Sequence, residues 1–498
     1  MNALNILDLI LIAAYLAGVT LFGLRFRTRQ NTLKDYFLAD NKIPWWAISL
    51  SIVAAETSTL TLISVPGLAY DKDFRLLQLV VGYVLGRVIV SFIFLPKYFS
   101  GHLLTAYQLI EGRFGQGLRT MTAGLFLLTR AAAEGVRVFA VALVVRIAFG
   151  AAFPAVSELQ SDVIAIAVVV LLTLAYTFHG GMAAVIWTDV IQLSIYLCGV
   201  VVGVFTILHL IHGGWGTVAA VAIPAGKFRV FDLSPDIFQT YSLWSGVLGG
   251  IFLTLASHGT DQLIVQRLLS ARSERDAKKA LIASGVAVLL QFTLFLFVGA
   301  LLFVFYRLTP PLTAFSRSDV IFPTFIVSRM PHGMSGLLIS AILAAAMSNL
   351  SAALNSLSST SMVDFYARAF PQTPQERLMK LSRWMTIFWA VVLFALAILA
   401  RGGGRVLEMG LSIASVAYGS LLGVFLLGIL TRRASQMGAG IGMCIGLLLN
   451  LYLWQFTKIP FTWYVVIGAI ATFITGYGLS LFSPPTPEQT GLKQSTGD

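Results

Sequence analysis

Long apolar runs recur along this chain, and they restrict its fold more than any other feature. A membrane-spanning helix needs about 20 mostly apolar residues, and the sequence supplies thirteen such runs, near 5–24, 45–69, 74–96, 120–150, 161–179, 184–211, 242–266, 280–306, 334–364, 383–400, 406–430, 436–456 and 461–482. Only 11% of the residues are charged, against about 25% in soluble domains. We therefore predict an all-α polytopic membrane protein.

Basic residues in the predicted loops set the orientation. Arg25, Arg27 and Arg29 follow the first run, which lacks the basic start and cleavage site of a secretory signal, so we expect a retained span. Loops on that side hold twenty Lys and Arg, and the opposite loops hold ten. The positive-inside rule then places the N-terminus outside and the C-terminus in the cytoplasm of a cell membrane. The net charge of +12 therefore indicates contact with membrane lipid and no nucleic-acid partner.

Polar residues interrupt the second run. Glu56 and several hydroxyl residues occur between Ala54 and Thr61, and Pro66-Gly67 follows. Where a membrane helix unwinds, its free carbonyls must be buried or line a cavity, and transporters use such backbone to hold cations. We expect a broken helix here. The alternative is a continuous helix softened by Ser and Thr, with Glu56 bonded to a neighbour.

Three charges share one face of the fourth run. Arg130, Glu134 and Arg137 stand at i, i+4 and i+7, which places them within an arc of roughly 60°. Their formal surplus of +1 could be balanced by an anionic substrate, or by another carboxylate such as Glu56 or Asp189. A closed structural ion network is the competing explanation.

Two further interruptions carry acids. Gly180-Gly181 predicts a tight turn before a helix that contains Asp189, which has no basic neighbour in sequence and should be protonated or face a cation. The seventh run ends in a polar segment that includes Asp261. If runs two to six and seven to eleven are inverted five-helix repeats, the two interrupted helices are equivalent and meet at the midplane.

The ninth run has a stripe of small and polar residues. At about 100° per residue, one helical face collects Ala341, Ala345, Ser348, Ser351, Ala352, Asn355 and Ser359. In lipid such a face either packs closely against another helix or lines a polar pathway. This segment alone leaves both possibilities open.

Several motifs, in the same order, resemble those of the sodium:solute symporter family. The resemblance runs from about Leu7 to Phe482, and its most specific elements are Asp35-Tyr36-Phe37-Leu38-Ala39, Gly180-Gly181 to Trp187-Thr188-Asp189, Asp261-Gln262 with Gln266-Arg267, Gly336-Leu337-Leu338 to Leu354-Asn355-Ser356, and Gly423-Val424-Phe425-Leu426-Leu427-Gly428. The resemblance implies inverted five-helix repeats with the leucine-transporter-like fold, alternating access and coupling to inward sodium movement.

The resemblance also implies a sodium site between the second and ninth spans. By motif its ligands would be the Ala54, Thr57 and Ala345 carbonyls with the side chains of Ser348 and Asn349. Such all-oxygen ligands suit a hard cation. Asn349 departs from the serine or threonine usual in the family. A second ion site found in some members would use Asp189, Ser348, Ser351 and Ala352. Because alanine cannot supply the last ligand, we expect Asp189 to tune or hand on the first ion instead, with Ser351 as a further ion-coupling residue.

Substrate contacts in the family fall at positions on several spans. Carried onto this chain, with Glu134 added from the charged face, they are Glu56, Ser58, Thr61, Gln78, Arg130, Glu134, Asp261 and Gln291. Arg130 resembles the residue that clamps a carboxylate in sialic acid carriers, and bidentate pairing suits a guanidinium. Glu56 could meet a substrate amine or hydroxyl, or balance the arginines.

These observations predict a sodium-coupled symporter that imports a small polar solute, such as a carboxylate or a sugar-like molecule. The expected parts are residues 1–44 (first span and cytoplasmic loop), 45–211 (first repeat), 212–241 (extracellular loop), 242–430 (second repeat), 431–482 (two added spans) and 483–498 (cytoplasmic tail). A sensor that binds substrate without transporting it is the first alternative, motivated by Asn349 and Ala352. An intramembrane enzyme fits poorly, because no metal-ligand motif or Ser/His pair lies in a run.

Overall fold

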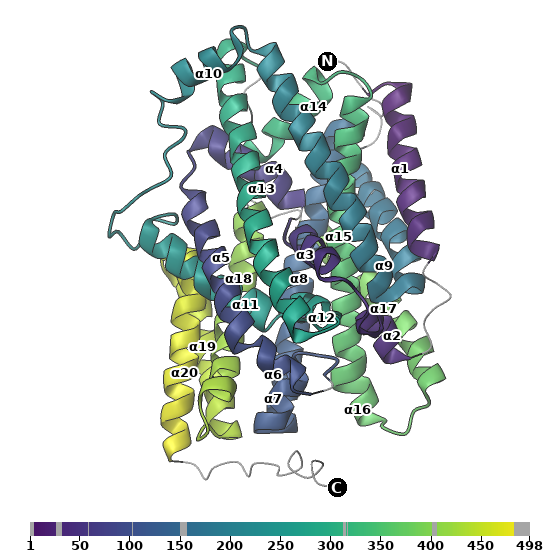
Figure 1. Cartoon of the computed structure of the whole chain (residues 1–498), viewed down its shortest axis with the longest axis vertical. Helices are drawn as coiled ribbons and strands as arrows, with labels where there is room; N and C mark the ends of the chain where they lie inside the picture. Colours follow the sequence, from purple (N-terminus) through teal and green to yellow (C-terminus); the bar gives the residue numbers. More distant parts are fainter. Residues whose placement is uncertain are drawn as a thin grey trace.

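Helices make up the regular structure of the described chain (Figure 1). The computed structural model describes residues 4–25, 32–57, 59–101, 103–149, 157–311, 315, 317–400 and 406–482. The α-helices are α1 (Ile6–Leu24), α2 (Leu33–Leu38), α3 (Trp45–Glu56), α4 (Thr59–Asp71), α5 (Leu76–Ile93), α6 (Leu95–Phe99), α7 (Tyr107–Phe114), α8 (Gln116–Phe149), α9 (Glu158–Leu210), α10 (Gly214–Ala222), α11 (Gly249–Gly259), α12 (Gln262–Leu269), α13 (Glu274–Leu308), α14 (Ile321–Arg329), α15 (Met334–Thr360), α16 (Ala367–Ala369), α17 (Gln375–Leu399), α18 (Val406–Leu430), α19 (Gln436–Phe456) and α20 (Phe461–Leu481). Short 3-10 or π turns are η2 (Ala39–Asn41), η3 (Trp244–Leu248), η4 (Ser318–Val320) and η5 (Ser361–Tyr366).

The bundle is built from membrane-length helices. Within the described residues, seven helices are long and apolar enough to cross a bilayer, and the bent pair α3 and α4 makes eight if it counts as one span. Ile6–Phe22 and Leu159–Ala175 are shorter apolar helices. A multi-pass membrane protein is therefore confirmed. Helix α1 begins at the upper end of the bundle in Figure 1, and α20 ends at the lower end.

The predicted glycine turn divides α9. Gly181 has φ 55° and ψ −153°, a conformation outside the helical region that an L side chain rarely adopts. The break separates a shorter apolar segment, Leu159–Ala175, from Gly181–Leu210, which is long and apolar enough to cross a membrane. A turn at this position is confirmed.

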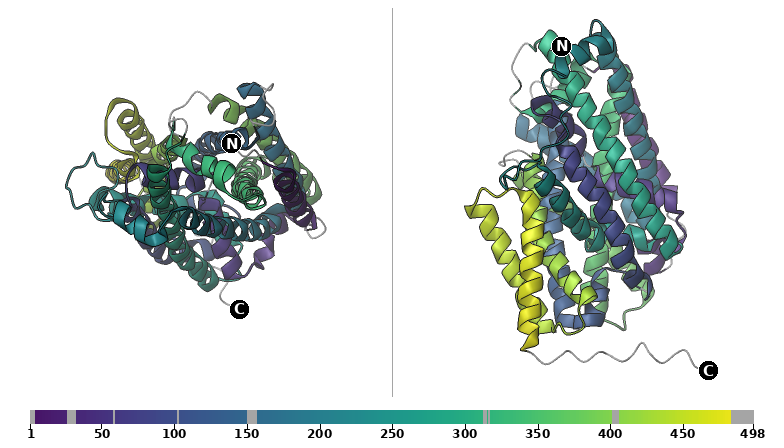
Figure 2. Two further views of the ribbon diagram at one scale, coloured as in Figure 1. Left: turned by 90° about the horizontal axis from the view of Figure 1, so that it is seen from above. Right: turned by 60° about the vertical axis from the view of Figure 1, so that its left-hand side comes forward.

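Close helix contacts position the centre of the bundle. Helix α5 packs on α11, and a Cβ added to Gly250 would lie 2.3 Å from the Leu79 carbonyl oxygen, so only glycine permits this approach. Helix α15 packs along α9 in the interior, whereas α19 and α20 lie side by side at one edge of the bundle (Figures 1 and 2).

The polar stripe of the ninth run faces protein. Its members on α15 with described side chains are buried: Ser348, Ser351, Ala352, Asn355 and Ser359 are each at most 1% exposed. Hydroxyls on this face bond to main-chain or polar groups inside the bundle, as Ser359 does with the Gln266 side chain at 3.2 Å. The stripe therefore does not face lipid.

Candidate functional site: a charged cavity between two broken helices

Two helix breaks form the framework of the site. Helices α3 and α4 are bent by 61° around Thr57, whose φ of −83° and ψ of 83° are not helical. Helix α11 ends at Gly259, and Asp261 begins α12 by accepting a hydrogen bond from the Leu263 amide at 2.9 Å. Both interruptions that the polar sequence predicted are present.

The ends of the two broken helices come together at Glu56 and His258. His258 Nε2, at the end of α11, lies 3.4 Å from Glu56 Oε1, at the end of α3. His258 Nδ1 lies 2.9 Å from Ser257 Oγ. Polar side chains next to the two breaks therefore lie together inside the bundle, away from lipid.

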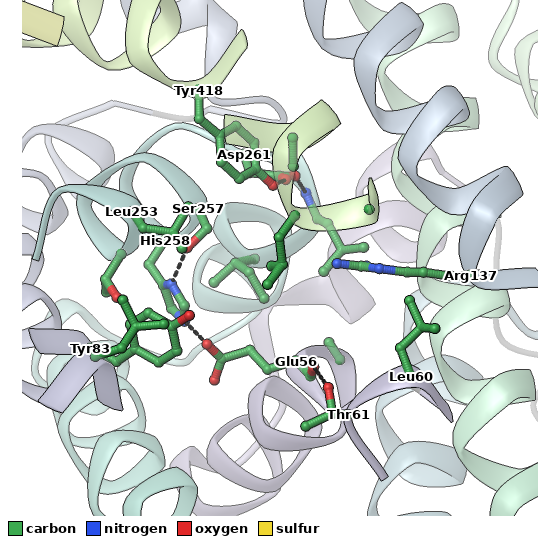
Figure 3. A pocket seen from close by; sticks show the side chains of 18 of the residues that line it. Glu56, Leu60, Thr61, Tyr83, Arg137, Leu253, Ser257, His258, Asp261 and Tyr418 are labelled. Carbon is green, nitrogen blue, oxygen red and sulfur yellow. Dashed lines mark hydrogen bonds and ion pairs between the residues drawn. The ribbon is translucent and has the colours of Figure 1, made fainter. Parts of the chain in front are cut away.

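A cavity of about 120 Å³ opens beside this pair (Figure 3). One water needs about 10–15 Å³ on the same measure, so the space holds a small organic molecule. Its walls come from α3, α4, α5, α8, α11, α12, α13 and α18. Tyr241, in the loop before α11, also lines it. In Figure 3 Arg137 enters from one side and His258 lies on the other.

Four of the predicted substrate residues line this cavity: Glu56, Thr61, Arg130 and Asp261. Ser58 lies outside the described residues. Glu134 stands behind the lining, bonded to Arg130 and Arg137.

The two predicted amides are bonded to protein groups instead. Gln78 Nε2 donates to the Tyr241 carbonyl at 2.8 Å, and its oxygen accepts from the Asp232 amide at 3.2 Å. Gln291 accepts from Thr57 Oγ1 at 3.0 Å and donates to Tyr196 OH at 2.8 Å. Gln78 therefore ties α5 to the loop before α11, and Gln291 supports the break after α3.

Asp261 joins the three charges of α8 in one network. Arg130 Nη1 donates to Asp261 Oδ2 at 3.3 Å, and its Nη2 donates to Glu134 Oε2 at 3.2 Å. Arg137 Nη1 lies 3.3 Å from the same Glu134 oxygen, and the Tyr418 hydroxyl donates to Asp261. The formal surplus of +1 on α8 is thus balanced by Asp261, a partner that the sequence analysis did not assign to it.

Glu56 has a separate partner. Its carboxylate pairs with Arg87, a fully buried arginine of α5 whose Nε donates to Ser284 Oγ at 3.2 Å. Sequence reasoning missed Arg87 and His258 as site residues. An arginine inside an apolar run was itself a signal, since a buried charge requires a partner.

One donor on Arg130 is left over. Among the described residues its Nε–H is buried and has no hydrogen-bond acceptor, although Arg130 lines the cavity. A buried, unsatisfied N–H costs about 1–3 kcal/mol. An acceptor atom of a bound molecule would remove that cost.

The residues proposed for the ion site also come together. Asn349 Nδ2 lies 3.4 Å from the Ala54 carbonyl oxygen and 3.2 Å from that of Thr57. Ser348 Oγ donates to Asp189 Oδ1 at 2.6 Å. Ala345 lies in α15 one turn before Asn349, and Ser351 Oγ donates to the Ser348 carbonyl at 2.9 Å.

Asp189 faces a cation, which is one of the two states expected of it. Its Oδ2 lies 2.9 Å from Arg267 Nη2, and both side chains are fully buried. Ser51 bonds to the same carboxylate and accepts from Arg267 Nε at 2.8 Å. The carboxylate thus connects α3, α9, α12 and α15, and Ser348 links it to the region of Asn349.

A membrane bundle in which two broken helices meet at a cavity lined by charged and apolar side chains is typical of a secondary transporter. A sequence model of the sodium:solute symporter family matches residues 36–446. The chain belongs to that family, and it is a sodium-coupled symporter and not an enzyme.

Individual relatives match over nearly the whole chain. The sodium/sialic acid symporter SiaT of Proteus mirabilis is 29% identical, with 94% of each chain covered. Sodium-coupled monocarboxylate transporter 1 of Mus musculus is 26% identical over 93% of this chain and 71% of its own. A solved substrate-bound, outward-open sodium-coupled sialic acid symporter superposes with a TM-score of 0.86 at 27% identity, covering 97% of this chain and 99% of that one.

Proposed function

We propose that this chain imports a small organic carboxylate that also carries hydroxyl or amino groups, together with sodium, by alternating access. The observation that carries the proposal is the mixed charge of the cavity wall. Arg130 and Arg137 offer donors to a carboxylate, whereas Glu56 and Asp261 offer acceptors to hydroxyl or amino groups. Relatives named for sialic acid and for monocarboxylates support an acidic solute.

The proposal assigns roles to individual residues. Arg130 binds the carboxylate, since it has a buried Nε–H to satisfy. Arg137, whose side chain is 20% exposed, contributes a second guanidinium. Thr61 and Glu56 contact the polar remainder of the solute. Glu134, Gln78 and Gln291 act as positioning residues behind this lining.

Sodium in this proposal binds at the break of α3, facing α15. Ala54 and Thr57 supply carbonyl oxygens, Ala345 supplies a third, and Ser348 and Asn349 supply side chains. Asp189 and Ser351 tune the site through Ser348. Oxygen ligands of this kind suit a hard cation.

The finer architecture belongs to the same proposal. Thirteen spans, with residues 45–211 and 242–430 as inverted repeats, account for two broken helices that meet at one cavity. We place the N-terminus outside and the C-terminus in the cytoplasm. In support, the first residue of α1 and the last residue of α20 lie at opposite ends of the bundle (Figure 1). A second cavity of about 270 Å³ shares Leu76 and Tyr241 with the first and is lined in part by residues 236 and 238–241 of the predicted extracellular loop, so we place solute entry on that side.

Uptake by purified protein in liposomes tests the function. Hydroxylated and amino-bearing carboxylates are offered with sodium outside and potassium inside, and protein-free liposomes are the control. We expect sodium-dependent accumulation of at least one acid and none of neutral sugars. Saturable binding without accumulation would instead establish the sensor, and accumulation of neutral sugars alone would refute a carboxylate substrate.

A further inference from the structure

The Asn349 amide occupies the space between two carbonyl oxygens at the end of α3. Its Nδ2 lies 3.4 Å from the Ala54 oxygen and 3.2 Å from the Thr57 oxygen. A primary amide nitrogen carries two hydrogens, so it can donate to both carbonyls at once. The opposite amide orientation would place Oδ1 against two other oxygens, which is repulsive without a cation between them.

The same location has the properties of a cation site. Carbonyls in the last turn of a helix lack intrahelical amide partners, and the helix dipole makes that end negative. Ser348 gives its hydroxyl hydrogen to Asp189 at 2.6 Å, which leaves its oxygen lone pairs for another partner. Asn349 is 2% exposed and Ser348 is 1% exposed, so bulk water does not compete for their polar atoms.

An amide donor and a sodium ion cannot occupy this position together. The N–H groups carry partial positive charge and fill the volume in which the two carbonyl oxygens converge. For the ion to reach these oxygens, Nδ2 must leave. A rotation of about 180° about the terminal side-chain bond, a torsion with two broad and roughly equivalent minima, turns Oδ1 toward the ion.

We propose that Asn349 is a resident donor that competes with sodium at the break of α3, and that rotation of its amide is part of ion binding. Asn349 thereby sets the sodium concentration at which the carrier is loaded. The inference rests on the sodium site proposed above and deepens it. Two neutral hydrogen bonds of this length shift the ion equilibrium by roughly tenfold, or about 1.4 kcal/mol.

A sodium titration of the purified full-length chain tests the inference. Intrinsic tryptophan fluorescence follows binding while choline replaces sodium at constant ionic strength. Asn349→Ser keeps an oxygen ligand and removes the donor, so the half-saturating sodium concentration should fall by roughly tenfold. Asn355→Ser, the same change at another buried position of α15, should leave it within about twofold of wild type.

The outcomes separate this inference from the function on which it rests. A half-saturating concentration for Asn349→Ser that equals or exceeds that of wild type would overturn the competing role and make the amide an ordinary ligand. If wild type itself shows no sodium response, the sodium site is refuted as well. Asn349→Thr repeats the test if the serine variant does not fold, and sodium-free melting temperatures of the variants check that their folds match wild type.

Discussion

Removing the charge of Arg130 separates binding from structure. In the wild type this guanidinium lies 3.3 Å from Asp261 and 3.2 Å from Glu134, and all three side chains are at most 6% exposed. Arg130→Gln leaves Glu134 with Arg137 but deprives Asp261 of its cation. Breaking a buried ion pair in this way costs about 3–5 kcal/mol, and we expect the lower end because both contacts are long.

A compensating variant provides the control. Arg130→Gln combined with Asp261→Asn removes one charge of each sign and leaves an amide pair, so most of the lost stability should return. Substrate binding should not return, since the donor that we assign to the carboxylate is still missing. Melting of the three proteins in detergent, with and without substrate, measures both effects.

Two results would refute this reasoning about Arg130. If both variants bind the acid as tightly as wild type, Arg130 has no part in recognition and the network is purely structural. If the double variant melts no higher than Arg130→Gln, the loss of stability does not come from the unpaired Asp261 carboxylate.

Three further perturbations test other parts of the molecule. Ser348→Ala should raise the half-saturating sodium concentration at least tenfold by removing an oxygen ligand, and an unchanged titration would exclude Ser348 from the site. Asp189→Asn leaves the buried Arg267 charge without its carboxylate, so we expect about 3–5 kcal/mol of lost stability and altered sodium coupling. A variant that melts and transports like the wild type would show the pair to be incidental. Asp8, on α1, accepts from the Gly333 and Gly336 amides at the start of α15, at 2.6 and 2.9 Å; Asp8→Ala should cost about 1–2 kcal/mol in a denaturation assay, and substrate affinity in the folded fraction should stay unchanged.

Local chemistry made the helix breaks predictable. A glutamate and several hydroxyls within an apolar run are unfavourable against lipid. A Gly-Gly pair is less stable in a regular helix than other residues are, so it marks a place where the helix can break. The breaks at Thr57, Gly181 and Thr260 follow from these patterns. The burial of the α15 stripe followed from its 3.6-residue period.

Pairing between distant helices was not predictable from spacing. The three charges of α8 share a face by periodicity, but nothing within their own helix indicates that Asp261, 131 residues further on, completes the network. Arg87 and Arg267 pair with carboxylates on other helices, 31 and 78 residues away in sequence, and such contacts depend on how the helices pack. The orientation of the Asn349 amide likewise depends on where α3 ends relative to α15.

The charge balance of the cavity predicts how membrane voltage acts on transport. Among the described residues at the cavity, Arg130 and Arg137 balance Glu134 and Asp261, and Arg87 balances Glu56. The loaded site therefore carries only the charge of its cargo. A zwitterion carried with one sodium moves a net charge of +1, and 100 mV then contributes about 2.3 kcal/mol, or roughly fifty-fold accumulation. A monoanion carried with one sodium moves no charge, so a potassium diffusion potential imposed with valinomycin should leave its uptake unchanged. The voltage dependence of uptake gives the charge moved per transport cycle, and the solute and its sodium stoichiometry give the charge of the cargo. If the two charges differ, charged groups of the protein move with the cargo, and the fixed, balanced ion network is refuted.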